Sequence, residues 1–278
     1  CGSMIKTDGP VPMRMIGETE FVNGIAAMSA GGEYGTARVA AGIVGHADLC
    51  LGDDVAPVLA AHIKAGGGRF RGIRHSCTWD PSPDVPNARC EPPEHLYQQE
   101  NFRQGFAQLA KHNMSFEGWC FHTQIKELTE LAQAFPDTRI ILDHFGGPLG
   151  IGPYAGKRND DFAQWQTDVT ELARCQNVVA KLGGINMELN GFGWHERDRP
   201  PGSEELMQAT RPYYDHAIEQ FGVDRCMFES NFPVDMCSCS YNVLWNSFKH
   251  LTADYTAGEK AALYHDTANR VYRLDDPV

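Results

Sequence analysis

An abrupt change from apolar to polar residues marks the segment ILDHFGGP, residues 141–148. Asp143 and His144 end an apolar run, and the glycines after them allow the chain to turn tightly. Because side chains alternate along a strand, we expect the two to point to opposite faces, with His144 in a cavity and Asp143 bracing the wall. An imidazole there can transfer protons, so we interpret His144 as catalytic. The alternative is a structural histidine bonded to a backbone carbonyl.

The segment MFESNFPVD, residues 227–235, shows the same change from apolar to polar residues. If Asn231 faces a cavity, Glu229 lies on the same face one layer deeper, and Asp235 belongs to the loop that follows. A buried carboxylate can act as a general base. We therefore interpret Glu229 and Asn231 as catalytic and Asp235 as substrate-binding. Alternatively, Glu229 is a buried ion-pair partner of Lys181 or of an arginine.

Further polar residues stand near the ends of other apolar runs. The planar guanidinium of Arg74 is suited to hold a carboxylate or a developing oxyanion, although an ion pair within the protein wall is an equal alternative. Several such residues on different strands are harder to explain as structural than one alone. We expect substrate contacts from His46, His75, His122 and Lys181. The remaining histidines on predicted helices are interpreted as surface or packing residues: His62, His112, His216, His250 and His265.

The elements that position these residues follow a repeated strand–helix rhythm. Six apolar runs are predicted as strands, at residues 40–49, 70–77, 116–122, 139–145, 178–185 and 225–232. Helices are predicted at residues 17–30, 55–65, 101–111, 125–135, 162–174, 204–221, 241–251 and 258–274. Such apolar strands suit a parallel sheet covered on both faces.

Two parallel architectures fit this rhythm. A doubly wound sheet for dinucleotides would need a Gly-x-Gly-x-x-Gly turn opening a helix, and the sequence has none. We therefore predict an α/β fold of the (β/α)8 TIM-barrel type, in which the active site gathers at the carboxyl ends of the strands. The long loops at residues 78–96, 147–160 and 190–202 would then lie over the mouth of the barrel.

The composition limits the classes of partner. The net charge of −12 and the pI near 5.3 argue against nucleic acid, because no basic field replaces phosphate counterions. No apolar run reaches eighteen residues, so no membrane segment is expected. Nine cysteines without framework spacing indicate reduced thiols, including the loop residues Cys237 and Cys239. We expect a cytoplasmic protein with a small-molecule substrate, and homo-oligomerisation stays open.

The strings LDHFGGP, KLGGI and MFESNFPVD, in this order and spacing, resemble the amidohydrolase-related family of TIM-barrel hydrolases. The resemblance is to the amidohydrolase 2 branch that includes sugar lactonases and 2-pyrone-4,6-dicarboxylate lactonase. The strings GETEFVNG, GIVGHADL and RFRGIRH are also similar to this branch, so the likeness extends from Gly17 to the C-terminus. It implies one barrel domain over residues 1–278 and a hydrolase that opens a sugar-derived or carboxylated lactone with water.

The resemblance also assigns residues. His144 matches the histidine of the family's sixth strand, and Arg74 the arginine of the fourth. His122 falls at the fifth-strand position, which in different branches is a metal ligand or a substrate contact. Asn231 stands where many relatives have the eighth-strand aspartate. We expect a carboxylate or His144 to activate water, while Arg74 and His122 stabilise the tetrahedral oxyanion.

Two departures from the family pattern matter. Relatives open with a strand carrying His-x-His, which occurs nowhere in this chain. Residues 1–4 resemble the end of the family's second strand, so the barrel is expected to lack its N-terminal strands; alternatively, Gly-Ser-Met is a cloning remnant. Asn231 cannot accept a proton as aspartate does. Glu229 or Asp235 would then supply the base, or the protein would bind without hydrolysis.

These departures also bear on cofactors. A tight metal site needs more ligands than His122 and His144, so no cofactor is expected, and zinc or manganese held by these two histidines is the alternative. Two other functions stay open on the same fold: a metal-dependent decarboxylase or amidohydrolase, and a non-catalytic ligand-binding barrel.

Overall fold

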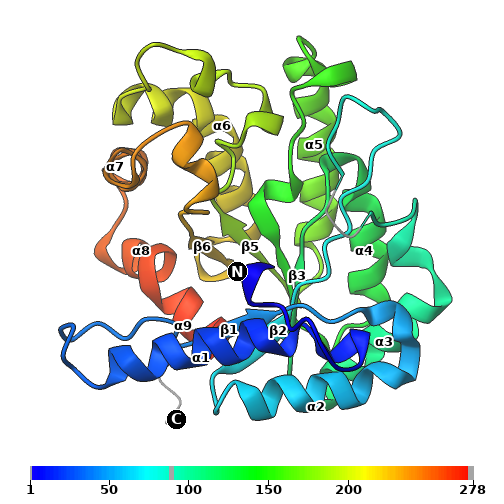
Figure 1. The fold of residues 1–278 in the computed structure, drawn as a ribbon. Helices are drawn as coiled ribbons and strands as arrows, with labels where there is room; N and C mark the ends of the chain where they lie inside the picture. Colours follow the sequence, from blue (N-terminus) through cyan, green and yellow to red (C-terminus); the bar gives the residue numbers. More distant parts are fainter. Residues whose placement is uncertain (1, 88–90, 275–278) are drawn as a thin grey trace.

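A computed structural model describes residues 2–87 and 91–274 of the protein. At its centre lies one sheet of six parallel strands that neighbour each other in chain order (Figure 1). The strands are β1 Ile43–Gly45, β2 Phe70–Ile73, β3 Ser115–Gly118, β4 Ile140–Leu142, β5 Val178–Leu182 and β6 Cys226–Phe228. The six predicted strands and their parallel arrangement are confirmed, although each is shorter than its apolar run. In the part of the chain that is described, β1 and β6 are the edges of this curled part of a TIM barrel.

Helices surround the sheet on its outer side (Figure 1). Amphipathic patterning explains their placement: on α3, Phe102, Phe106 and Leu109 recur every three to four residues and are fully buried. The helices are α1 Ile16–Ala30, α2 Ala56–Ala65, α3 Glu100–Lys111, α4 Ile125–Ala134, α5 Arg158–Ala173, α6 Ser203–Phe221, α7 Tyr241–Leu251, α8 Ala257–Ala261 and α9 Thr267–Tyr272.

The two faces of the sheet have different environments. Ile140 and Leu142 of β4 pack in the main hydrophobic core, together with the surrounding helices. Between them, Ile141 points the other way, into a separate cluster on the inner face. This inner cluster consists of Ile141, Val179 and Met227 from three adjacent strands and Val271 from α9. The C-terminal helix therefore closes the interior of the curled sheet from one end.

Two expectations at the chain ends are wrong. The helix predicted over residues 258–274 is interrupted, because a π-helical turn at Ala262–Asp266 separates α8 from α9. Gly2–Met4 forms a 3-10 helix and not the end of a strand.

The seven described cysteines are free thiols, as expected, and Cys1 and Cys90 lie outside the described residues. No helix within the described ranges combines the length and apolar character needed to cross a membrane.

Candidate active site

Charged side chains continue the inner face of the sheet beyond the apolar cluster. Asp143 and Glu229 stand two positions after Ile141 and Met227, so the alternation of a strand turns them inward. Lys181, two positions after Val179, faces the same way. The register of the sheet also brings these residues together: Lys181 of β5 lies opposite Met227 of β6, and Glu117 of β3 lies opposite Ile141 of β4. The carboxyl ends of β3 to β6 thus bring four charges to one place, as expected for the mouth of a barrel.

His144 lies at the centre of this group. Its Nδ1 is 2.5 Å from Glu229 Oε1, and its Nε2 is 3.2 Å from Arg74 Nη2. A guanidinium can only donate, so Nε2 accepts and the ring proton sits on Nδ1, where it is donated to Glu229. The structure therefore joins three of the predicted catalytic residues directly. Glu229 pairs with this histidine and not, as the alternative had it, with Lys181 or an arginine.

The expected opposition of Asp143 and His144 is wrong. Arg74 contacts both, with its Nε 3.4 Å from Asp143 Oδ2. β4 ends at Leu142, and His144 adopts a left-handed backbone conformation with φ of 52°. This conformation, rare for a non-glycine residue, turns the imidazole back toward the side that Asp143 already faces.

Glycines of the KLGGI segment make room for this arrangement. A Cβ on Gly184, whose φ is +71°, would collide with the imidazole of His144. A Cβ on Gly183 would collide with Glu229. Both positions therefore require glycine because the backbone after β5 packs directly against the histidine–glutamate pair.

Buried ionisable side chains on β3, on β5 and at the end of β4 contact one another next to the His144–Glu229 pair. Lys181 Nζ contacts Glu117 and lies 3.1 Å from Asp143 Oδ1. Burial would raise the pKa of Asp143, but the positive charges of Lys181 and Arg74 outweigh it and hold that pKa well below its usual range. For Glu117, burial dominates over the charge of Lys181 and raises the pKa to about 8. Tyr272 of α9 donates a hydrogen bond of 2.7 Å to Glu117.

Asn231 and Asp235 form a second group beside the first. Asn231, also left-handed with φ of 52°, donates from Nδ2 to Asp235 Oδ1 at 2.8 Å. Asn186 approaches the other oxygen of the carboxylate at 3.4 Å. Burial raises the pKa of Asp235 to about 6, partly offset by the hydrogen bond from Asn231. The loop after β6 thus keeps a carboxylate in direct contact with the amide of Asn231.

Two predicted substrate-binding histidines lie together at the ends of β1 and β2. The rings of His46 and His75 meet edge to face, with centroids 5.2 Å apart. His46 Nδ1 bonds to the backbone oxygen of Arg74 at 3.1 Å, whereas His75 Nδ1 accepts from the Leu49 amide at 3.2 Å. Burial and the nearby His46 lower the pKa of His75 to about 4, so His75 is neutral. Of the two histidines, only His46 is described as hydrogen-bonded to the backbone of Arg74.

His122 has a different set of neighbours. Its Nδ1 accepts from the Leu149 amide at 3.3 Å, and its ring meets Tyr154 at 5.1 Å. Tyr154 in turn donates to Asp80 at 2.7 Å. The described contacts of His122 are thus with the long loops over the barrel mouth, and contact with substrate stays a prediction.

Sequence reasoning missed Glu117, Asn186 and Tyr272. A single carboxylate inside an apolar strand could have singled out Glu117, because a buried carboxylate needs a partner. Asn186 and Tyr272 carry no such signal. Each lies in a loop or a distant helix, and only the folded chain brings it to the site. Lys181 was predicted to bind substrate, and its described partners are the two carboxylates of Glu117 and Asp143.

The residues of the site do not fit a metal centre. Nδ1 of His144 donates to Glu229 and Nδ1 of His122 accepts from a backbone amide, so each ring has only Nε2 to offer a metal. Within the described ranges, no group of three or more histidine, cysteine, aspartate or glutamate side chains is placed to hold a metal ion. The pair His122 and His144 therefore lacks the third and fourth ligands that zinc requires.

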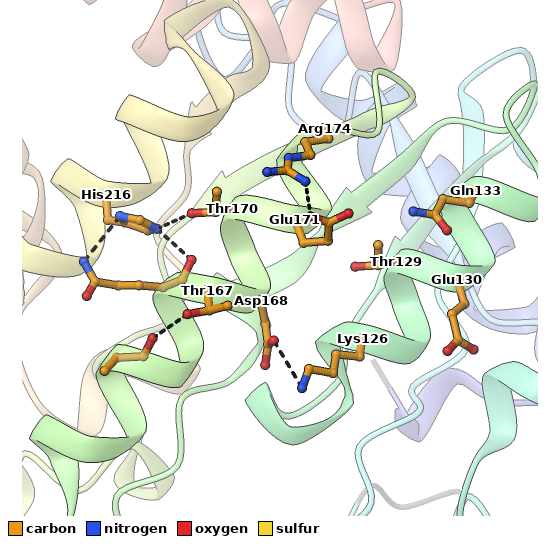
Figure 2. A pocket seen from close by; sticks show the side chains of 12 residues that line it. Lys126, Thr129, Glu130, Gln133, Thr167, Asp168, Thr170, Glu171, Arg174 and His216 are labelled. Atoms are coloured by element: carbon orange, nitrogen blue, oxygen red, sulfur yellow. Dashed lines mark hydrogen bonds and ion pairs between the residues drawn. The ribbon is translucent and has the colours of Figure 1, made fainter.

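A groove of about 810 Å³ between α4 and α5 lies away from the strand ends (Figure 2). Four of its charged side chains form two pairs: Lys126 with Asp168 at 3.7 Å, and Arg174 with Glu171 at 2.6 Å. Helices α4 and α5 cover the outer face of the sheet, so this groove is separated from the mouth. The strand ends remain the candidate active site.

A sheet of parallel strands with polar residues converging at its carboxyl ends defines a barrel enzyme, and the comparisons identify the family. The model described as "Amidohydrolase" matches residues 35–274, and the chain belongs to this family of hydrolases. It is 35% identical to the protein y4mH of Sinorhizobium fredii, over 95% of this chain and 77% of that protein. It is 28% identical to an L-fucono-1,5-lactonase of Burkholderia multivorans, over 87% and 74% respectively.

Solved structures agree with the fold. An amidohydrolase from Burkholderia multivorans with bound zinc superposes with a TM-score of 0.71 at 26% identity, covering 92% of this chain and 79% of that one. A putative 2-pyrone-4,6-dicarboxylic acid hydrolase from Pseudomonas putida superposes with a TM-score of 0.58 at 20% identity, covering 84% and 72%. The chain thus spans about three quarters of these relatives, and the predicted fold and family are confirmed.

Proposed function

We propose that the protein hydrolyses a lactone at the carboxyl ends of its strands. The observation that carries this proposal is the placement of His144 between Glu229 and Arg74. A base, the carboxylate that orients it and a cation for a developing oxyanion are the groups that ester hydrolysis needs. The lactonase among the relatives supports a cyclic ester as the substrate class.

In the proposed reaction, the Arg74 guanidinium turns from His144 Nε2 to the lactone carbonyl. Nε2 then takes a proton from the water molecule that attacks this carbonyl. Glu229 stabilises the imidazolium that forms. The carbonyl π electrons move to its oxygen, and the Arg74 guanidinium, which is 37% exposed, binds this oxyanion. As the carbonyl reforms, the bond to the ring oxygen breaks. The ring oxygen leaves as an alkoxide that takes the proton from His144, which yields a hydroxy acid.

The other groups have supporting roles in this scheme. Lys181 and Glu117 fix the charge of Asp143, which holds the Nε edge of Arg74. Asp235 lies within electrostatic range of His144 and Glu229, and it offers a second carboxylate at the mouth. Because Asp235 is present, the asparagine at position 231 does not deprive the site of its acid group. We assign His46, His75 and His122 to the walls of the substrate pocket.

A panel of sugar-derived and carboxylated lactones tests the proposal. Acid release above the uncatalysed rate is expected with at least one of them, and it should be lost in His144→Gln. Release of carbon dioxide would favour a decarboxylase, and stabilisation by a lactone without conversion would favour a binding protein. Absence of turnover with every lactone would contradict the proposal.

A metal is tested separately. The relative crystallised with zinc motivates the measurement. We expect activity to survive extensive dialysis against a chelator, because the described residues place no third or fourth ligand beside His122 and His144. Stoichiometric zinc or manganese that is lost together with activity would show that the scheme omits an essential group.

A further inference from the structure

A second polar cavity, of about 480 Å³, lies at the opposite end of the sheet. Ser115 opens β3, Arg139 immediately precedes β4, and Asn177 immediately precedes β5, so the cavity sits at the amino ends of these strands. Arg270 and Val271 of α9 contribute another part of its wall, followed by Arg273. Val271 also belongs to the inner cluster. That apolar layer separates this cavity from the charges around Lys181.

Three arginines converge on this cavity. Arg139, Arg270 and Arg273 all line the cavity, and after burial the positive charges of Arg270 and Arg273 lower the pKa of Arg139. Asp137 is the acidic residue among the described lining groups. A concentration of positive charge is unexpected in a chain whose net charge is −12. Like charges held together in a folded protein cost free energy unless an anion relieves them.

The guanidinium groups of Arg139 and Arg270 differ in how many hydrogen-bond partners they have. Arg270 donates one bond to the backbone oxygen of Asp224. Within residues 2–87 and 91–274, the Arg139 side chain is exposed at the cavity wall and makes no hydrogen bond or ion pair. By contrast, Asn177 directs its amide group to the backbone oxygens of Ala132, Phe135 and Thr138. The amide of Asn177 thus shapes the wall, and Arg139 is the group that lacks a counter-charge.

We propose that this cavity is a binding site for a phosphate group, separate from the lactone-hydrolysing mouth. Guanidinium groups bind phosphate oxygens through paired, charge-assisted hydrogen bonds, and two or three of them can surround one tetrahedral dianion. The cavity has room for inorganic phosphate or for the phosphoryl end of a small metabolite. Because the site lies at the amino ends of the strands, phosphate binding there does not require the activity at their carboxyl ends.

Calorimetric titration with inorganic phosphate at constant ionic strength tests the site. Saturable binding is expected for the full chain, and Arg139→Gln should weaken it about tenfold or more, which corresponds to the loss of one charge-assisted contact. Arg199→Gln is the matched control, because this exposed arginine lies in the loop before α6 and should leave binding unchanged. Without phosphate, Arg139→Gln should melt at the same or a higher temperature, since it removes repulsion.

Other results would overturn the proposal. Equal phosphate stabilisation of the wild type and of Arg139→Gln would indicate only a general salt effect. Loss of phosphate binding in Arg74→Gln would place the anion in the mouth instead. Asp275 and Asp276 follow Arg273 closely in the sequence. If phosphate bound only after removal of residues 275–278, the chain's own carboxylates would be the occupants. Titration with citrate in parallel separates phosphate from carboxylate recognition, because binding of citrate alone would also contradict the proposal.

Discussion

Glu229 Oε1 lies 2.5 Å from His144 Nδ1, while the opposite nitrogen of the same ring faces Arg74. The two residues are 85 positions apart in the chain, on the ends of β4 and β6. This pair fixes which nitrogen of the imidazole can accept a proton.

Glu229→Gln should keep the shape of the site and remove the charge that stabilises the imidazolium. We expect kcat for lactone hydrolysis to fall by about 10²- to 10⁴-fold, with a small change in KM. Steady-state kinetics measures this. Glu33→Gln, at an exposed position between α1 and β1, should behave as the wild type. Unchanged kcat in Glu229→Gln would exclude the carboxylate from the reaction.

Gly184→Ala should displace His144, because the new Cβ would occupy the position of the imidazole. The left-handed φ of +71° adds about 1 to 3 kcal/mol of backbone strain. We expect a lower melting temperature together with a loss of kcat. Gly258→Ala has no atom within 4 Å of its new Cβ and should leave both unchanged. If Gly184→Ala were fully active, the close packing of KLGGI against the site would be irrelevant to catalysis.

Lys181→Met should leave the fully buried carboxylate of Asp143 without its nearest cation. Breaking a buried pair from one side costs about 3 to 5 kcal/mol of unfolding free energy. Denaturant unfolding measures the loss. The matched surface pair is Lys6 with Glu20, whose side chains are both exposed and lie 2.7 Å apart, and Lys6→Met should cost less than about 1 kcal/mol.

A second substitution checks the cause of that loss. In a Lys181→Met background, Asp143→Asn removes the uncompensated charge and should restore part of the stability. If the two losses were simply additive, the pair would not interact as the 3.1 Å separation of Nζ and Oδ1 indicates.

Asp235 should give the protein a pH dependence near pH 6. Its folded pKa of about 6 lies above the ordinary value of 3.8. The folded state therefore binds the proton more tightly, and the stability from this group, complete below about pH 4, is lost as the pH rises through 6. Melting temperatures should decline less over this window in Asp235→Asn than in the wild type. An identical decline in both proteins would assign the effect to other groups.

The sequence predicted the strands and the inward direction of Glu229 because strand alternation is a local property. It failed for the expected opposition of Asp143 and His144, because His144 adopts a left-handed turn that no alternation rule contains. It also missed the pairing of Tyr272 with Glu117, which are 155 residues apart. For Arg74 the sequence left a catalytic group and a wall ion pair as equal alternatives; the structure shows the ion pair with Asp143 and a contact with His144, and the catalytic role stays a prediction. Long-range partners of this kind follow from packing, which a single sequence does not display.

Helix α9 has a consequence for how the chain tolerates shortening. Val271 fills the interior beneath three strands, and the next residue, Tyr272, touches the carboxylate of Glu117. A truncation that removed this final helix would open the floor of the barrel and let water reach the Lys181 ion pairs. Water there would screen the charges that hold Arg74 in place. Loss of α9 would therefore disturb the site at the opposite ends of the strands.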